Sequence, residues 1–225
     1  MTFSLLGIDA ETGRLGGVIS SSSPAVAARC LAVRAGVGTA ASQNVTDPRL
    51  GPRLLDLLAT GRSARDAIDD IVASAPDVGY RQLAVVDRQG RTAAYSGANA
   101  LGRHACAQGG GAVAAGNLLA DEGVPQRMVD AFAAAAGAAL GDRLVAALRA
   151  GLAAGGEEGP VGSAGLLLAD PVVAWPVADL RVDWAEDPIA DLAALWELWK
   201  PQSDSYVRRA LEPAAAPSFD VPGDR

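Results

Sequence analysis

Residues 2–20, TFSLLGIDAETGRLGGVIS, hold two short apolar runs on either side of a polar turn. The runs at residues 2–8 and 15–20 are rich in residues that strands bury, and residues 9–13 between them supply turn chemistry. This pattern is typical of a β-hairpin. We therefore expect the fold to be organised around a hairpin that begins at the N-terminus.

The segments that follow predict a second hairpin, and after it the apolar residues recur with the periodicity of a helix. Apolar residues 27–33 and 37–42 predict a second hairpin. Leucines between residues 50 and 58 then recur at helical spacing. Ser63, followed by Asp66, predicts the N-cap of another helix. We expect two helices after the first four strands.

The same order recurs in the second half of the chain. Strands are predicted over residues 82–87, 91–96 and 112–115, helices over 125–132 and 139–152, and further strands over 164–168, 172–175 and 179–183. Asp187-Pro188 predicts the start of a last helix, whose apolar face carries Trp196 and Trp199. These tryptophans are expected to pack on the body of the protein or to form a subunit interface, so a homo-oligomer is one expectation.

Blocks of strands alternate with blocks of paired helices, which favours antiparallel sheets covered by helices. The expected fold class is α/β of the α+β type: a four-layer αββα sandwich of two antiparallel sheets flanked by helix pairs. Residues 1–200 are expected to form this domain. Residues 201–225 are expected to form a C-terminal helical extension with a disordered tail.

The composition narrows the class of function. The chain has 225 residues and a formal net charge of -7, and its arginines are dispersed. Because a phosphate backbone is held by clustered basic residues, no nucleic-acid partner is expected. No apolar stretch is long enough to cross a membrane, and residues 1–4 lack the basic region of a signal peptide. A cytoplasmic location is therefore expected.

The residues that hold metals and cofactors are sparse. One histidine and two distant cysteines do not have the spacing of zinc ligands, and Gly109-Gly110-Gly111 lacks the lysine of a phosphate-binding loop. The sequence predicts neither a metal nor a cofactor. Cys30 and Cys106 are expected to be reduced thiols buried in strands.

Five stretches carry a resemblance to a known family: Thr2-Phe3-Ser4 with the turn at 9–13, residues 34–44, Tyr80-Arg81-Gln82, residues 116–119 and residues 179–183. In this order and spacing they resemble the Ntn-hydrolase-like family called domain of unknown function 1028 (DUF1028), over about residues 2–195. The resemblance implies the αββα sandwich of N-terminal nucleophile (Ntn) hydrolases. This agrees with the layers expected from the periodicity.

The resemblance also implies a nucleophile. In that fold the first residue of the mature chain attacks the substrate, and Thr2 becomes first once Met1 is removed. A threonine hydroxyl needs a base, and a free α-amino group with a pKa of about 7.7 to 8.0 can serve from the same residue. The implied reaction is hydrolysis of a small amide or peptide-like substrate through an acyl-enzyme on Thr2.

Other residues are implied around Thr2. The strand end that includes Gln43 and Asn44 is expected to supply hydrogen-bond donors to the oxyanion, and Asn117 is a second candidate that also fits ordinary turn chemistry. Arg29 stands where proteasome-like members of the fold have a lysine, and it is expected to position or tune the amine.

Three residues are candidates for substrate binding, and each also fits an ordinary turn, packing or surface position: Arg81, His104 and Asp183. The alternative hypothesis for the whole chain is a noncatalytic ligand-binding or assembly protein of the same fold. The missing lysine motivates this alternative, as does the fact that many proteins begin Met-Thr without catalytic reason. Replacement of Thr2 by alanine would abolish activity under the first hypothesis and leave ligand binding intact under the second.

Overall fold

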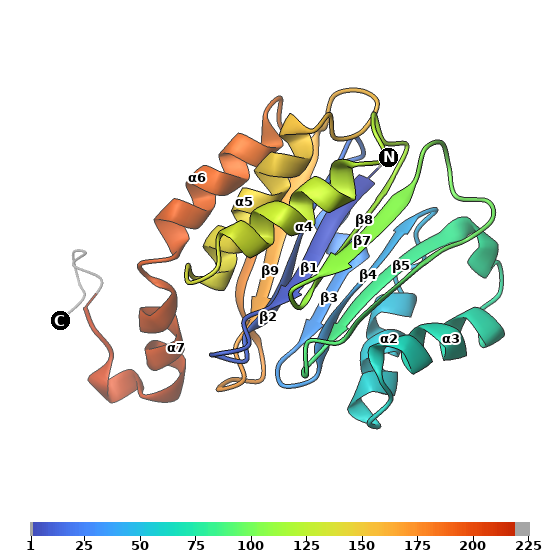
Figure 1. Cartoon of the computed structure of the whole chain (residues 1–225). Helices are drawn as coiled ribbons and strands as arrows, with labels where there is room; N and C mark the ends of the chain where they lie inside the picture. The colour runs from blue at the N-terminus through green and yellow to red at the C-terminus, as the bar shows by residue number, and fades with distance from the viewer. Residues whose placement is uncertain (1, 219–225) are drawn as a thin grey trace.

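The computed structural model describes residues 2–218, and two antiparallel sheets form its centre (Figure 1). The larger sheet has six strands, in the order β10 (Pro176–Val182), β9 (Ser163–Ala169), β2 (Leu15–Ser21), β1 (Thr2–Ile8), β8 (Ala112–Asn117) and β7 (Ala105–Gly109). The smaller sheet has four, in the order β3 (Leu31–Arg34), β4 (Gly38–Asn44), β5 (Arg81–Asp87) and β6 (Thr92–Ser96).

Helices cover the outer face of each sheet. The larger sheet packs against α4 (Val124–Ala134), α5 (Leu140–Ala153) and α6 (Pro188–Trp199), and the smaller one against α2 (Leu50–Ala59) and α3 (Ala64–Ser74). A third apolar cluster lies between the sheets and includes Leu6 and Val113 from one sheet and Ala84 from the other. The layers therefore run helix, sheet, sheet, helix, which confirms the predicted fold class.

The first hairpin is at the centre, as its sequence predicted. Every residue of β1 is buried, because the strand is covered on both faces. Phe3 and Leu5 pack into the layer of α4 and α5, whereas Leu6 and Ile8 pack between the sheets. Since side chains alternate along a strand, Thr2 and Ser4 share the inter-sheet face with Leu6.

Local signals placed several helix ends correctly. The Ser63 hydroxyl accepts a hydrogen bond from the Asp66 N–H at the start of α3. The Asp187 carboxylate accepts one from the Ala190 N–H at the start of α6, where Pro188 is the first helical residue. Both caps satisfy backbone donors that a helix start leaves unpaired.

One predicted strand was wrong in its first half, since only residues 31–33 of 27–33 lie in β3, and another was wrong throughout. Residues 27–30 lie in a short helix, α1 (Val26–Cys30), because Ala25 adopts a left-handed conformation with φ of 51° that redirects the chain after Pro24. Residues 172–175 form the connection between β9 and β10, where the Asp170 carboxylate accepts a hydrogen bond from the Val172 N–H and makes a turn.

The expectation for each cysteine was wrong in one respect. Cys30 is buried but lies in α1, and Cys106 lies in a strand but is exposed, because β7 is the edge strand of the larger sheet. The C-terminal segment forms α7 (Ser203–Leu211) and a turn of 3₁₀ helix at Pro213–Ala215. The last part of the predicted disordered tail, residues 219–225, lies outside the described residues.

The pairing of the strands brings the ends of several strands together along one side of the larger sheet, perpendicular to the strand direction. Because β1 is antiparallel to both β2 and β8, its first residue lies beside the last residues of those strands. β9 runs antiparallel to β2, so its first residue and the last of β10 lie on the same side. We call this side the N-terminal end of the sandwich, and it is uppermost in Figure 1. Across residues 2–218, no helix has the length and apolar character needed to cross a membrane.

Candidate functional site

Thr2 is the first residue of β1 and lies at the N-terminal end of the sandwich. It is directly opposite Asn117 on β8, and the pairing of Phe3 with Ser20 places it beside Ser21 on β2. Thr2 is 5% exposed, and its hydroxyl donates to the Ser21 hydroxyl at 3.4 Å. Its side chain therefore enters a polar region between two apolar sheets.

That polar region is a chain of buried side chains from both sheets. The Ser4 hydroxyl donates to Oε1 of Gln43 at 2.7 Å, and Nε2 of Gln43 donates to Oε1 of Gln82 at 2.8 Å. Nδ2 of Asn117 donates to the same Gln82 oxygen at 3.1 Å. All four side chains are buried. We call these four residues the inter-sheet network.

Two backbone carbonyls fix the orientation of the glutamine amides. Nε2 of Gln43 also donates to the carbonyl of Ala115 at 3.2 Å, and Nε2 of Gln82 donates to the carbonyl of Gly116 at 2.9 Å. Because a carbonyl can only accept, each Nε2 must face it, and Oε1 of Gln82 must be an acceptor. Asn117 must then present its Nδ2 group to Gln82.

This orientation leaves one acceptor of Asn117 unused. Its Oδ1 atom is buried and has no hydrogen-bond partner among the described residues. A buried carbonyl oxygen without a donor costs about 1–3 kcal/mol, so native structures rarely keep one without a use. The unpaired oxygen belongs to the residue that faces Thr2 across the ladder.

A second chain of polar groups links Thr2 to Arg29. The Ser21 hydroxyl lies 2.8 Å from the Ser23 hydroxyl, which accepts a hydrogen bond from Nη2 of Arg29 at 2.6 Å. Nη1 of Arg29 also donates to the carbonyls of Pro24 and Ala25. The guanidinium thus fixes the loop between β2 and α1 and lies two hydroxyl groups away from Thr2. We call Ser21, Ser23 and Arg29 the hydroxyl chain.

Ser163, at the start of β9, holds the same loop from the other side. Its hydroxyl donates to the carbonyl of Ser23 at 2.6 Å and accepts from the Val26 N–H at 3.2 Å. Asp183 contributes through its backbone, because its carbonyl accepts a hydrogen bond from the Ala25 N–H at 2.9 Å. The Asp183 side chain is exposed, so this residue approaches the site by its main chain.

A buried acid lies in the loop between α5 and β9. Glu157 is 3% exposed, and burial raises the pKa of its carboxyl group above the ordinary value of 4.5. Attraction to the positively charged N-terminus opposes this rise in pKa. Both carboxyl oxygens of Glu157 are buried without a hydrogen-bond partner among the described residues.

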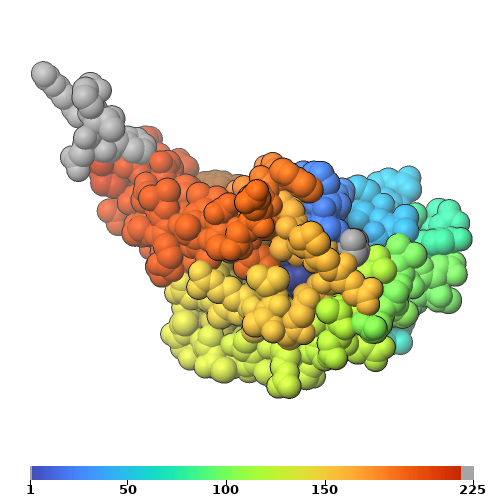
Figure 2. All heavy atoms as spheres, turned by 90° about the horizontal axis from the view of Figure 1, so that it is seen from above, coloured from blue at the N-terminus to red at the C-terminus, as the bar shows by residue number. Residues whose placement is uncertain are grey.

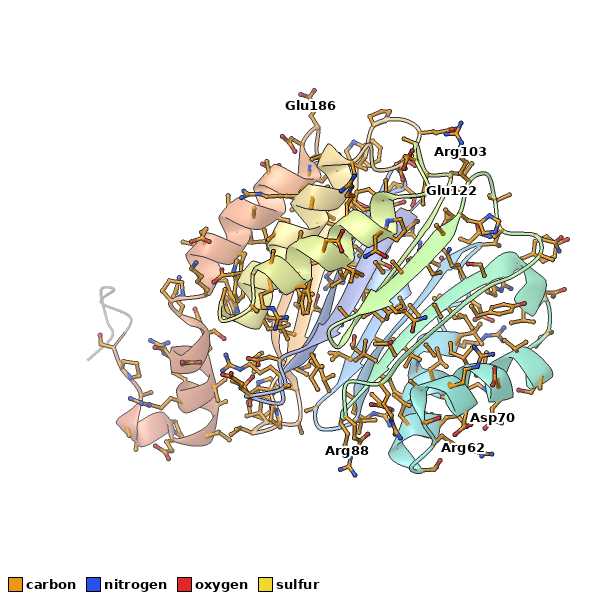
Figure 3. All side chains as sticks on the ribbon, in the orientation of Figure 1. Arg62, Asp70, Arg88, Arg103, Glu122 and Glu186 are labelled. Atoms are coloured by element: carbon orange, nitrogen blue, oxygen red, sulfur yellow. The ribbon has the colours of Figure 1, made fainter. Side chains whose placement is uncertain are left out.

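Hydrogen bonds fasten this loop at the N-terminal end. Nη1 of Arg103 donates to the carbonyl of Ala120 at 2.6 Å and pairs with the Glu158 carboxylate at 2.9 Å. The label of Arg103 marks this end in Figure 3. In Figure 2, which views the same end, the loop is amber and borders a hollow in which the start of the chain is visible in dark blue.

The remaining predicted residues lie around this region without joining the inter-sheet network. Nδ2 of Asn44 donates to the Tyr80 carbonyl at 2.6 Å, and its Oδ1 accepts from the Leu101 N–H at 3.1 Å. Nη1 of Arg81 donates to the Val45 carbonyl at 2.6 Å. Asn44 and Arg81 therefore both connect loops through backbone groups.

His104 is exposed, and its Nδ1 atom is 3.0 Å from the carbonyl of Gly102. Among residues 2–218, no group of three or more His, Cys, Asp or Glu side chains is arranged to hold a metal ion. Of the eight predicted site residues, the structure therefore brings together Thr2, Gln43, Asn117 and Arg29.

Sequence reasoning missed Ser4, Gln82, Ser21, Ser23 and Glu157 as parts of this region. Ser4 and Gln82 had a usable signal, because each is a polar residue within an otherwise apolar predicted strand. Glu157 had none, because it belongs to a glycine-rich loop whose position depends on the docking of α5.

Comparisons with known proteins agree with this architecture. The model of a family of unknown function, DUF1028, matches residues 2–192. A crystal structure of a protein from Silicibacter pomeroyi, assigned to the same family, is 30% identical with a TM-score of 0.83, covering 92% of this chain and 94% of that chain. A structure of Anbu (ancestral beta-subunit) from Yersinia bercovieri is 9% identical with a TM-score of 0.38, covering 98% of this chain and 100% of that chain. Among curated proteins, no relative of the chain is found.

Proposed function

The chain belongs to the family of unknown function DUF1028, and from the surroundings of Thr2 we propose that it is an N-terminal-threonine amidohydrolase of the Ntn type. The substrate is a small amide or peptide-like molecule. The observation that carries the proposal is the position of Thr2 between two sets of polar side chains. Asn117 of the inter-sheet network is directly opposite Thr2 on β8, and Ser21 of the hydroxyl chain accepts a hydrogen bond from the Thr2 hydroxyl.

The proposal requires removal of Met1. Thr2 then carries a free α-amino group beside its own hydroxyl, and the two groups together supply a nucleophile and a base. Removal of an initiating methionine before a small residue is a cytosolic reaction, so we propose that the protein acts in the cytosol. The proposal needs no metal and no cofactor.

The reaction then proceeds in two steps with Thr2 as the catalytic residue. The hydroxyl oxygen attacks the amide carbon while the α-amino group takes the hydroxyl proton, and that proton passes to the leaving amine as the C–N bond breaks. An ester on Thr2 remains. Water attacks this ester with the amino group again taking a proton, which releases the carboxylic acid and restores the hydroxyl.

Asn117 is proposed as a positioning residue for the amine. Its unpaired Oδ1 atom accepts a hydrogen bond from the α-amino group, which directs the nitrogen lone pair toward the Thr2 hydroxyl. Gln82 and Gln43 hold Asn117 in this orientation, because their own amides are fixed by backbone carbonyls. This role differs from the donation to an oxyanion that the sequence suggested.

The hydroxyl chain and Glu157 are proposed to set the charge around the amine. Arg29 presents a fixed positive charge through Ser23 and Ser21, which favours the neutral amine that acts as a base. The buried carboxylate of Glu157 favours the ammonium form that follows proton transfer. Opposed charges of this kind keep an amine able to gain and lose a proton near neutral pH.

The proposal is tested by the rate at which β-propiolactone acylates the protein as the pH is varied. Wild-type protein is expected to be labelled at Thr2, with a rate at that residue that rises with pH through the pKa of its α-amino group, ordinarily about 7.7 to 8.0. Thr2→Ser should retain labelling because it keeps the hydroxyl and the amine. Thr2→Val has the same shape without the hydroxyl and should lose it.

Thr12→Val is the matched control, because Thr12 is an exposed threonine in the turn after β1. This variant should be labelled like the wild type. Equal labelling of the wild type and Thr2→Val would refute the proposal. Absence of labelling in wild-type protein that has lost Met1 would refute it too, and would favour the noncatalytic ligand-binding alternative.

A further inference from the structure

A mostly apolar pocket lies at the N-terminal end of the sandwich, apart from the residues assigned above. Its volume is about 390 Å³, and its walls are formed by Pro160, Val161, Gly162, Trp184, Ala185 and Glu186. These residues belong to the loop before β9 and the loop after β10. The label of Glu186 stands at this end in Figure 3, where its side chain projects outward.

Trp184 is the main apolar wall of this pocket. It is 66% exposed, which is a large exposed area for an indole ring. The ring lies on the backbone of Gly162, since a Cβ atom added at Gly162 would be 2.5 Å from Cζ3 of Trp184. The glycine therefore lets the ring rest against the main chain, and the rest of the ring stays open to a ligand.

Backbone hydrogen bonds connect this pocket to the Thr2 site. The Gly162 N–H donates to the carbonyl of Ser21 at 2.8 Å, and the Ala185 N–H donates to the carbonyl of Gly162 at 2.9 Å. Ser21 is the residue whose hydroxyl accepts the hydrogen bond from Thr2. The loops that form the pocket are thus tied to the strand next to β1.

The sheet order sets the distance between pocket and nucleophile. β1, β2 and β9 are consecutive strands, and Gly162 directly precedes β9. Neighbouring strands are about 4.8 Å apart, so two spacings separate Thr2 from the start of β9 by about 10 Å. A substrate whose amide carbon lies at Thr2 can therefore place in the pocket a group that is about 10 Å from that carbon.

We propose that this pocket binds an apolar, ring-sized group of the substrate, so that the protein acts on amides with an aromatic or branched apolar group about 10 Å from the scissile bond. This inference rests on the proposed function. The single carboxylate on the pocket wall, that of Glu186, disfavours an anionic group there. The substrate class is therefore a neutral or cationic amide with one apolar end.

The first experiment measures binding without chemistry, in the Thr2→Ala protein. The probe is 6-phenylhexanamide, whose ring and amide are separated by about the required distance, and hexanamide is the probe without the ring. Binding of the phenyl probe should shift the indole N–H signal of Trp184 in a ¹H–¹⁵N spectrum. Hexanamide should bind at least about tenfold more weakly, as expected when a pocket loses its apolar group.

Three variants test whether the pocket is responsible. Trp184→Ala removes the wall, and Gly162→Ala displaces the ring through the short contact described above. Both should weaken binding of the phenyl probe at least about tenfold. Trp175→Ala is the control, because Trp175 is also exposed but lies in the β9–β10 connection at the opposite end of the sheet. Unchanged affinity in both Trp184→Ala and Gly162→Ala would overturn the inference.

A second experiment separates this inference from the proposed function. Wild-type protein is labelled with β-propiolactone and with a β-lactone that carries a phenylbutyl group. Faster labelling by the phenylbutyl lactone, lost in Trp184→Ala, supports both proposals. Equal rates for the two lactones overturn the pocket inference and leave the nucleophile in place. Labelling by neither lactone, with tight Trp184-dependent binding of the phenyl probe, overturns the hydrolase and keeps the pocket as a ligand site.

Discussion

Thr2 and Asn117 face each other across the antiparallel ladder of β1 and β8, and Asn117 holds a buried carbonyl oxygen that has no partner among the described residues. The position opposite the first residue of β1 is thus occupied by an amide whose nitrogen is committed to Gln82. An acceptor fixed in this way is suited to the α-amino group that Thr2 gains when Met1 is removed.

Asn117→Leu removes that acceptor while nearly conserving side-chain volume. Gln82 keeps its hydrogen bond from Gln43, so the loss of stability should be about 1 kcal/mol. The rate of lactone labelling should fall at least about tenfold, because the amine is no longer oriented. A purely structural role would change the unfolding midpoint and leave the labelling rate at the wild-type value.

Gln82→Leu, in β5 of the smaller sheet, should be much more destabilising than the same substitution at an exposed position of the larger sheet. It leaves Nε2 of Gln43, Nδ2 of Asn117 and the Gly116 carbonyl with fewer partners in a buried layer. The expected loss is about 2–4 kcal/mol, since each unsatisfied buried group costs about 1–3 kcal/mol. Gln108→Leu, at an exposed position of β7, should change stability by less than about 0.5 kcal/mol. Urea unfolding of the two variants measures the difference.

The pH dependence of stability reports on Glu157. Burial raises the pKa of its carboxyl group, so the folded state favours the protonated form. Its contribution to stability is therefore fully present below the ordinary pKa of 4.5 and is lost as the pH rises through the folded-state pKa. Glu157→Gln stays uncharged at every pH and should unfold at a higher temperature than the wild type at pH 7.

The difference between Glu157→Gln and the wild type should disappear at about pH 4, where both carry an uncharged group. Glu158→Gln is the control, because Glu158 is the exposed neighbour and pairs with Arg103. This variant should show no such gain at pH 7. An equal unfolding temperature for the wild type and Glu157→Gln across this pH range would contradict the burial of a charged carboxylate.

Arg29 should not tolerate lysine as a substitute. The guanidinium contacts Ser23, Pro24 and Ala25 from two nitrogen atoms, and an ammonium cannot reproduce this geometry. Arg29→Lys should therefore lower the labelling rate although the charge is kept. Ser23→Ala, which interrupts the hydroxyl chain and leaves the charge in place, should lower it to a similar degree. A labelling rate for Ser23→Ala equal to that of the wild type would show that Arg29 acts without this chain.

The sequence predicted the layers well because they depend on local periodicity. The first hairpin, the Ser63 cap and the start of α6 at Pro188 were all placed correctly. Errors occurred where local signals conflict. Residues 27–30 are apolar enough for a strand, yet alanine favours a helix, and the left-handed Ala25 decides between the two.

The site was less predictable because its contacts are distant in sequence. The Gln43–Gln82 and Asn117–Gln82 hydrogen bonds depend on the register between strands and on the packing of one sheet on the other. Periodicity gives neither quantity. Glu157 joins the region only because α5 returns the chain to the N-terminal end. Thr2, Gln43, Asn117 and Arg29 were predicted from the family resemblance and not from their spacing.

The intact mass of the purified protein, before and after treatment with a β-lactone, is the decisive test of Thr2 as the nucleophile. The expected result is that wild-type protein lacks Met1 and gains the mass of one lactone, while Thr2→Ala lacks Met1 and gains nothing. A wild-type chain that has lost Met1 and takes up no lactone would contradict it, as would an equal adduct on Thr2→Ala.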